Sequence, residues 1–464
     1  MPQDIKLYNT KSKSVDNFIP IIEKEVGIYS CGPTVYHYAH IGNLRSYVFA
    51  DILRRTFVYA GYKVNHIINI TDVGHMVGDG DDGQDKLEKG AAREGKNVWE
   101  VAKMYTDAFM KDIEALNIPT SAYTFPRATD HIREQIGLIS ALEIEGYAYR
   151  ISDGIYFDTS KYKKYADFAH LDIEGLRSGA RVEENTEKRN ITDFALWKLS
   201  PADEERQMEW DSPWGKGFPG WHIECSAMSM KYLGETFDIH TGGIDHIPVH
   251  HTNEIAQSEC ATGKTYANYW MHVNFLNDTT GKMSKSNDDF LTLDVLKEKG
   301  YSPLAYRYYL LTTHYKSEIS FSFDGLDGSI HAYNKLTTWC SSNISSAGKI
   351  NNEYKNKFEE VIFNDLNTPQ AIALIWILLK DEAISDDDKY STIISFDEIL
   401  GLNLKNSVKE ELVISEEIKV LLEARALART NSNYQESDRL RDEILSLGYI
   451  VKDGKEGQEI SVSR

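Results

Sequence analysis

The chain has 464 residues, of which 41% are hydrophobic and 26% charged, ordinary values for a soluble globular protein. A chain of this length is too long to fold around one ordinary hydrophobic core, so we expect roughly two to four domains. The net charge of −20 argues against a broad nucleic-acid-binding face, because phosphate contacts need lysine and arginine. Any such partner would have to meet a local basic patch.

The cysteines are widely spaced, at Cys31, Cys225, Cys260 and Cys340. This spacing excludes a disulfide framework and suits a reducing compartment. The N-terminus has no apolar core typical of a signal peptide. The longest apolar run, residues 371–379, is too short to span a bilayer and predicts a buried helix segment. We therefore expect a cytoplasmic protein without membrane contact.

The first elements of the chain predict a parallel sheet. Residues 26–30 form a β-rich run, residues 46–62 have helical periodicity, and residues 63–71 predict a second strand. Strand, helix and strand in this order form a right-handed βαβ unit. Ligands of such sheets bind outside the carboxyl ends of the strands. Cys31 and the sequence HIGN, residues 40–43, both fall in the first loop at that edge.

The middle of the chain interrupts this pattern. Residues 78–90 are acidic and rich in glycine, but they do not match a calcium loop, so we expect a solvated loop. Residues 123–211 are a mixed stretch with a short strand at 154–158, which we interpret as an insertion. Residues 221–230 and 237–245 are expected to resume the strand-and-turn pattern of the sheet.

The second half of the chain is predominantly helical. From about residue 327 the apolar periodicity is that of helices, with breaks at 368–370 and 385–389. A charged helix is predicted from residue 416, followed by a short strand at 448–451.

A candidate metal site joins distant segments. His250 and Glu254 lie four residues apart in a helical pattern, so both project from one face. With Cys31 and Cys225, both expected at carboxyl ends of strands, they would offer two thiolates, an imidazole and a carboxylate, as zinc prefers. The alternative is that both cysteines are small core residues. No local Cys-x-x-Cys motif decides between these readings.

Two motifs suggest phosphate binding. In HIGN, a helix start with a histidine and a glycine could let a triphosphate approach backbone N–H groups and the helix dipole. In GKMSKS, residues 281–286, Lys282 and Lys285 could clamp phosphates from a mobile element. Taken singly, the first is equally typical of a polar turn and the second of a solvated basic loop.

Together and in this order, the two motifs resemble those of class I aminoacyl-tRNA synthetases. The sequences CGPTVY, HIGN, NITD, DFALWK, SPWGKGFPGWHIECSAM, GGID, HHTNE and KMSKS are similar to the cysteinyl-tRNA synthetase family in particular. They extend over residues 28–286. Many separate motifs in one order make a chance match very improbable.

The resemblance implies an α/β fold: a Rossmann-type parallel-sheet catalytic domain with an insertion, a helical bundle and a small C-terminal anticodon-binding domain. The expected domains are the two halves of the Rossmann catalytic domain at 1–122 and 212–266, the connective insertion at 123–211, the KMSKS-bearing linker domain at 267–326, the helical bundle at 327–405, and the tRNA anticodon-binding domain at 406–464.

The resemblance also implies which residues form the amino-acid pocket. One zinc ion per chain is expected there, and its implied ligands are Cys31, Cys225, His250 and Glu254. Trp221 is expected to wall the substrate pocket. Thr71 and Asp245 are expected near the amino acid and the adenylate.

The nucleotide signature is matched with one departure. His40, Gly42 and Asn43 match a motif whose last residue is usually histidine, and Asn43 can donate a hydrogen bond but cannot carry charge. Lys282 and Lys285 match the signature lysines. His40, Asn43 and both lysines are the expected catalytic residues, and Gly42, Asp245 and Lys285 are expected to bind ATP.

The implied activity is ATP-dependent ligation of L-cysteine to its tRNA through cysteinyl-adenylate, with Mg²⁺ accompanying ATP. Zinc would select the thiolate of cysteine over the hydroxyl of serine. We expect a monomer. Two alternatives remain: a ligase that joins activated cysteine to an amino-sugar, which would lack the long C-terminal region, and a non-catalytic RNA-binding paralogue, which would not need the complete motifs.

The tail gives conflicting indications. Residues 416–464 hold eight basic and ten acidic residues, which is no basic surface. Arg425 and Arg429 lie four apart and could line one helix face toward RNA. The alternative is a solvated helix held by salt bridges.

Overall fold

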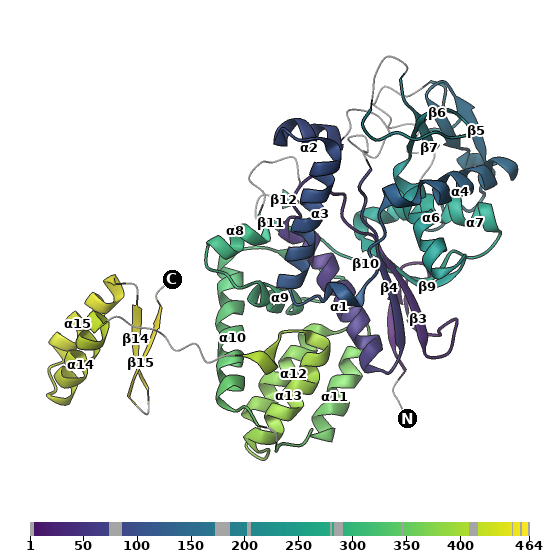
Figure 1. Cartoon of the computed structure of the whole chain (residues 1–464). Coiled ribbons are helices and arrows are strands. Elements are labelled where there is room, and N and C mark those ends of the chain that lie inside the picture. The colour runs from purple at the N-terminus through teal and green to yellow at the C-terminus, as the bar shows by residue number, and fades with distance from the viewer. Residues whose placement is uncertain are drawn as a thin grey trace. The chain divides into compact units, whose positions relative to one another are not determined.

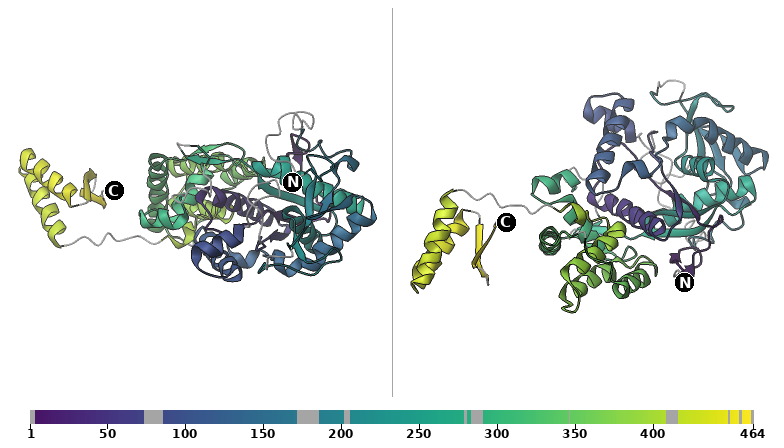
Figure 2. Two further views of the ribbon diagram at one scale, coloured as in Figure 1. Left: turned by 90° about the horizontal axis from the view of Figure 1, so that it is seen from above. Right: turned by 60° about the horizontal axis from the view of Figure 1, so that its bottom comes forward.

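The computed structural model describes residues 4–73, 86–171, 186–201, 206–278, 281–282, 291–345, 347–407, 416–447, 449–454 and 457–462. The chain divides into two compact units, Met1–Ser407 and Val408–Arg464. Figure 1 labels their elements, and Figure 2 shows them from two further directions. None of the helices in the described parts of the chain has the length and apolar character needed to cross a bilayer.

A parallel sheet forms the centre of the first unit. Its strands, in spatial order, are β10 (Ala267–Val273), β9 (Phe237–Gly243), β3 (Glu25–Ser30) and β4 (Lys63–Ile68). All three neighbouring pairs are parallel, as the sequence predicts. The chain leaves β3 toward β4 on one side, whereas β9 and β10 lie on the other. The point between β3 and β9 is therefore the switch point at which such sheets bind ligands.

Helix α1 (Ile41–Tyr59) connects β3 to β4 and confirms the predicted βαβ unit. It begins earlier than the predicted residue 46, because His40 caps it. One side of α1 carries Leu44, Val48 and Ile52, which are buried in the main hydrophobic core. The opposite end of the loop, at Cys31, stays at the edge of the sheet.

A second, antiparallel sheet takes three strands from the predicted insertion, 123–211, and a fourth from the residues that follow it. Its strands are β5 (Ala148–Ile151), β6 (Gly154–Phe157), β7 (Phe194–Leu199) and β8 (Gly217–Pro219). Figure 1 shows helices α4 (Ile132–Ile144), α6 (Trp221–Leu233) and α7 (Thr252–Thr262) beside it.

The predicted strand-and-turn pattern at 221–230 is wrong, because these residues form most of α6. Ile223, Ala227 and Met230 recur at helical spacing, and the first two are buried in a hydrophobic cluster with residues of α4 and β7. The expectation for 237–245 is confirmed, since β9 covers most of it. Cys225 therefore lies inside a helix rather than at the end of a strand.

The second half of this unit is helical, as predicted. Its helices are α8 (Leu293–Glu298), α9 (Pro303–Leu311), α10 (Phe323–Ser342), α11 (Asn352–Ile362), α12 (Thr368–Lys380) and α13 (Asp386–Leu400). The predicted breaks are helix starts: Asn367 caps α12, and Ser385 caps α13. The apolar run 371–379 lies in α12 but is amphipathic, with Ile375 fully buried and Ile377 54% exposed.

The remaining strands of this unit are β1 (Lys6–Asn9), β2 (Ser14–Asn17), β11 (Leu276–Asp278), β12 (Gly281–Lys282) and β13 (Ile319–Ser320). The remaining α-helices are α2 (Lys86–Glu94) and α3 (Val98–Ala115). Short helical turns are η1 (Thr120–Ala122), η2 (Ala128–His131), η3 (Thr159–Lys161), η4 (Ile244–His246), η5 (Ile247–His251) and η6 (Leu404–Asn406).

A buried ion pair joins the sheet layer to the helical part. Arg307 of α9 donates to the Asp51 carboxylate of α1 at 2.7 Å, and both side chains are fully buried. Arg55 donates to the same carboxylate oxygen at 2.6 Å. Arg307 also donates to the carbonyl oxygens of Leu116 and Leu400. These contacts connect α1, which begins at the candidate site, to α9 and to the segments that carry Leu116 and Leu400.

The second unit contains α14 (Glu416–Thr430), α15 (Tyr434–Ser446) and an antiparallel hairpin of β14 (Tyr449–Gly454) and β15 (Gly457–Val462). The side chain of Arg425 is 3% exposed and pairs with Asp453 at 3.0 Å. Arg429 pairs with the same carboxylate. Arg425 is thus an internal residue of this unit, and the expectation that it lines a face open to RNA is wrong.

Candidate active site

A cavity of about 180 Å³ opens at the edge of the sheet where β3 and β9 end. The loop after β3 supplies one wall, and α1, α3, α6 and the turn after β9 supply the others. The predicted site residues that line it are Cys31, Asn43, Thr71, Trp221, Cys225, Asp245 and His250. Elements far apart in the sequence therefore meet at the predicted ligand edge.

The other predicted site residues lie differently. His40 and Gly42 belong to the capped start of α1, and Glu254 is completely buried behind the cavity. The backbone of Lys282 ends β12, but its side chain and the whole of Lys285 lie outside the described residues. The acidic segment 78–90 is described only from residue 86 on.

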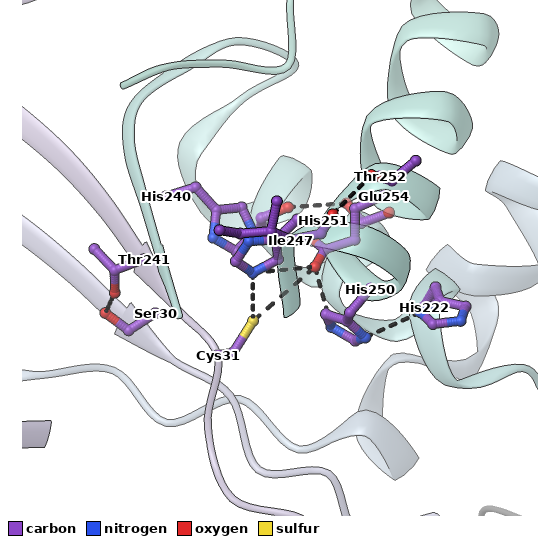
Figure 3. Close-up of polar contacts among 12 residues, drawn as sticks. Ser30, Cys31, His222, His240, Thr241, Ile247, His250, His251, Thr252 and Glu254 are labelled. Carbon is purple, nitrogen blue, oxygen red and sulfur yellow. Dashed lines mark hydrogen bonds and ion pairs between the residues drawn. The ribbon is translucent and has the colours of Figure 1, made fainter. Parts of the chain in front are cut away.

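The predicted metal ligands meet beside the cavity. One ligand atom from each of Cys31, Cys225, His250 and Glu254 lies within 4.8 Å of the others. Cys31 follows β3, Cys225 comes from α6, and the remaining two come from η5 and the first turn of α7. His250 Nε2 lies 3.0 Å from Glu254 Oε1, and Cys31 Sγ lies 4.0 Å from the same oxygen. Figure 3 shows Cys31, His250 and Glu254 converging.

The surroundings set the charges of these groups. Burial disfavours ionisation of Glu254, but His240 and His250 outweigh it and lower the pKa of this carboxyl. Burial also opposes protonation of His250, yet the Glu254 carboxylate and a hydrogen bond with Cys225 raise its pKa to about 10. A hydrogen bond with Cys31 lowers the pKa of Cys225 to about 6 against its burial. Burial and Cys225 raise the pKa of Cys31.

These donors fit a zinc ion. Two cysteines, one histidine and one glutamate are ligand types that zinc takes in tetrahedral sites. The lowered pKa of Cys225 makes a thiolate accessible near neutral pH, and the Glu254 carboxylate is ionised. A bound cation would replace the shared protons that now hold these groups together.

Residues behind the ligands fix their orientation. His222 Nδ1 lies 2.9 Å from His250 Nδ1. His240 Nε2 lies 2.8 Å from Glu254 Oε2, and the hydroxyl of Tyr266 donates to the same oxygen at 3.0 Å. Sequence reasoning missed these three residues. His222 lies inside a recognised motif and His240 shortly before another, but no spacing rule connects either of them to its partner.

A second set of possible ligands overlaps the first. Cys31, His240, His251 and Glu254 also offer ligand atoms within 4.8 Å of one another, and Cys31 Sγ lies 3.3 Å from His251 Nε2. Only Cys31 of this set lines the cavity, whereas Cys31, Cys225 and His250 of the first set do. The first set is therefore the one within reach of a molecule in the cavity.

The HIGN sequence forms a reciprocal cap at the start of α1. The backbone N–H of Asn43 donates to His40 Nδ1 at 3.1 Å, and the backbone N–H of His40 donates to Asn43 Oδ1 at 3.3 Å. A Cβ atom at Gly42 would lie 3.0 Å from His40 Nδ1, so glycine suits this close approach. The cap uses the oxygen of the Asn43 side-chain amide as an acceptor. The NH₂ group of the same amide is a hydrogen-bond donor that the cap does not use.

Two residues predicted for the substrate pocket, Trp221 and Thr71, line the cavity. The ring of Trp221 is 4.7 Å from that of His250, between centroids. Thr71 Oγ1 accepts a hydrogen bond from Asn69 Nδ2 at 2.9 Å, and Asn69 Oδ1 accepts one from the backbone N–H of Gly32. This network links the segment after β4 to the loop that carries Cys31.

Two family models match the chain. The class I (C) tRNA synthetase catalytic domain matches residues 17–331, and the cysteinyl-tRNA ligase anticodon binding domain matches residues 413–460.

Curated relatives match over nearly the whole length. Cysteine–tRNA ligase 1 of Burkholderia lata is 49% identical, covering 98% of this chain and 96% of its own. Cysteine–tRNA ligase of Treponema denticola is 44% identical, covering 97% of this chain and 98% of its own.

Solved structures are similar in fold. Methionyl-tRNA synthetase of Mycobacterium tuberculosis, in complex with methionyl-adenylate, aligns with a TM-score of 0.56 at 16% identity, covering 83% of this chain and 92% of its own. A leucyl-tRNA synthetase complex of Agrobacterium radiobacter aligns with a TM-score of 0.57 at 11% identity, covering 84% of each chain. The predicted α/β fold is confirmed by these neighbours.

Proposed function

Because this chain belongs to the cysteinyl-tRNA synthetase family, we propose that its cavity converts L-cysteine and ATP to cysteinyl-adenylate and that a zinc ion selects the amino acid. The chain is a cysteine–tRNA ligase, and its partners are the tRNA for cysteine, L-cysteine and ATP. The four free cysteines suit a reducing compartment, and we place the protein in the cytoplasm.

One observation carries the proposal for zinc: the ligand atoms of Cys31, Cys225, His250 and Glu254 lie within 4.8 Å of one another, beside the cavity. When bound there, zinc would accept the side-chain thiolate of cysteine as a ligand and would disfavour serine, whose hydroxyl stays protonated. A hydrophobic pocket alone separates near-isosteres by only roughly 10–200-fold.

The proposed chemistry requires little covalent work from the protein. The carboxylate of cysteine attacks the α-phosphorus of ATP, and pyrophosphate leaves with its Mg²⁺. A terminal ribose hydroxyl of tRNA then attacks the carbonyl carbon of the adenylate, and AMP leaves. The chain positions these groups and stabilises developing negative charge.

We assign the phosphates to the start of α1. There the positive end of the α1 helix dipole, the imidazole of His40 and the NH₂ group of Asn43 are suited to bind anions. Gly42 permits close approach, and Lys282 and Lys285 would add positive charge from the KMSKS segment. Thr71 and Asp245 are assigned to the amino acid and adenylate, and Trp221 to the wall of the cysteine pocket.

The anticodon-domain match over 413–460 favours tRNA over an amino-sugar as the acceptor. The purified full chain should catalyse ATP–pyrophosphate exchange with cysteine and should charge tRNA with cysteine. Serine should support neither reaction, and an amino-sugar should not replace tRNA. Exchange that serine supports as well as cysteine would contradict the proposed selection.

A further inference from the structure

The described lining of the cavity offers few cationic side chains to a triphosphate. Among the described residues that line it there is no lysine or arginine, and the only imidazoles are those of His37, His246 and His250. His250 belongs to the ligand set. His246 lies at the same end, with its ring centroid 5.1 Å from that of His250. His37 is the remaining imidazole.

His37 lies on the loop that leads into α1, three residues before the capping residue His40. It is half-buried and shares the cavity lining with Asn43. Because three residues of chain span at most roughly 11 Å, His37 lies near the start of α1, to which we assign the phosphates.

The ring of His37 is held in place by aromatic neighbours. It stacks on Tyr105 of α3 with centroids 5.8 Å apart and an interplanar angle of 11°, and it meets Tyr38 edge-on at 6.0 Å. The hydroxyl of Tyr105 is fixed in turn, because it accepts from Arg93 at 2.8 Å and donates to Glu94 at 2.7 Å. The imidazole is therefore oriented before a ligand arrives.

We propose that His37 binds the triphosphate of ATP and supplies the imidazole that the signature lacks at Asn43. An amide offers an uncharged donor, whereas an imidazole offers a ring N–H and, when protonated, a positive charge that strengthens hydrogen bonds to phosphate oxygens. This inference rests on the proposed ATP site at the start of α1.

The test measures ATP–pyrophosphate exchange at varied ATP and, separately, at varied cysteine. His37→Ala and His37→Phe are both expected to raise the KM for ATP by roughly tenfold or more, because each removes a hydrogen bond to a charged group. The KM for cysteine and the zinc content should not change. His331→Ala, at an exposed position of α10, is the matched control and should behave as the wild type.

The phenylalanine variant separates binding from packing. Phe keeps a ring against Tyr105 and Tyr38 but has no N–H group, so wild-type kinetics of His37→Phe would overturn the proposal in favour of packing. Adding Asn43→His to His37→Ala should restore most of the ATP affinity. If the double variant binds ATP as weakly as His37→Ala, the claim that His37 takes over the role of an imidazole at position 43 is overturned.

The two proposals fail differently. A wild-type chain without cysteine-dependent exchange would overturn the proposed function and this inference with it. Wild-type exchange with unchanged ATP dependence in both His37 variants would overturn the role of His37 alone. Thermal unfolding of each variant identifies any general loss of folding.

Discussion

His240 and Glu254 are joined inside the core of the catalytic unit: Nε2 of the histidine lies 2.8 Å from Oε2 of the glutamate, and both side chains are fully buried. The contact holds one carboxylate oxygen and leaves Oε1 facing Cys31 and His250. His240 is thus placed to position a candidate metal ligand.

Replacing His240 with alanine should therefore weaken zinc binding without abolishing it. We expect a loss of roughly 10–100-fold in zinc affinity, the effect typical of residues that orient a metal ligand. Competition with a chelator measures it. His131→Ala is the control, because His131 is also buried but bonds to Arg127 and Tyr232. An unchanged affinity in His240→Ala would contradict the positioning role.

The two overlapping ligand sets make opposite predictions for Cys225. If zinc lies at the cavity, Cys225→Ser should strongly reduce the zinc content from about one ion per chain, because zinc binds thiolate far better than hydroxyl. Cys340→Ser, at a buried cysteine of α10, should leave it unchanged. Full zinc content in Cys225→Ser, measured by elemental analysis, would indicate the set formed with His240 and His251.

Lys285→Ala should slow adenylate formation by roughly 10²–10³-fold, if this lysine acts on phosphate charge in the transition state. Cysteine affinity should stay close to that of the wild type. The prediction comes from the KMSKS match, since Lys285 lies outside the described residues. Pre-steady-state formation of adenylate at saturating ATP measures the effect, and an unaltered rate would refute the role.

Removing the second unit should separate activation from transfer. A chain that ends at Ser407 should form cysteinyl-adenylate at nearly the wild-type rate, because the cavity lies wholly in the first unit. Its kcat/KM for tRNA should fall by about tenfold or more, equivalent to about 1.4 kcal/mol. Salt should weaken tRNA binding by the full chain more steeply than by the shortened one. Equal tRNA affinity and equal salt slopes would contradict a role of the tail in RNA binding.

Within the tail, Arg425 should contribute to stability rather than to direct RNA contact. It donates to both carboxylate oxygens of Asp453 and to Gln458. Arg425→Ala should lower the free energy of unfolding of this unit by about 1.5–3 kcal/mol. Arg439→Ala is the matched control, because its ion pairs are exposed to solvent and should contribute little to stability. Equal stability of both variants in urea would contradict this view.

The parts predicted best from the sequence were those set by local pattern. The βαβ unit of β3, α1 and β4 follows from apolar periodicity, and the helical second half from repeated amphipathic segments. The position of Cys225 was predicted wrongly, because a short apolar run such as 221–230 fits a strand or a buried helix equally well.

Contacts between distant segments were beyond local pattern. The pairing of His240 with Glu254 depends on how β9 faces α7, and that of Arg425 with Asp453 depends on a hairpin expected only as a short strand. The four candidate ligands were proposed from helical spacing and from expected strand ends, and the family resemblance implied the same four residues. Their function as a zinc site remains a prediction.

The most direct measurement compares the binding of cysteine and serine by calorimetry, with zinc-loaded protein and with protein stripped of zinc by a chelator. With zinc, cysteine should bind more tightly than serine by more than the roughly 10–200-fold that a hydrophobic pocket provides. Without zinc, the preference should fall to within that range. A preference of the same size in both preparations would contradict the claim that the metal selects the thiolate.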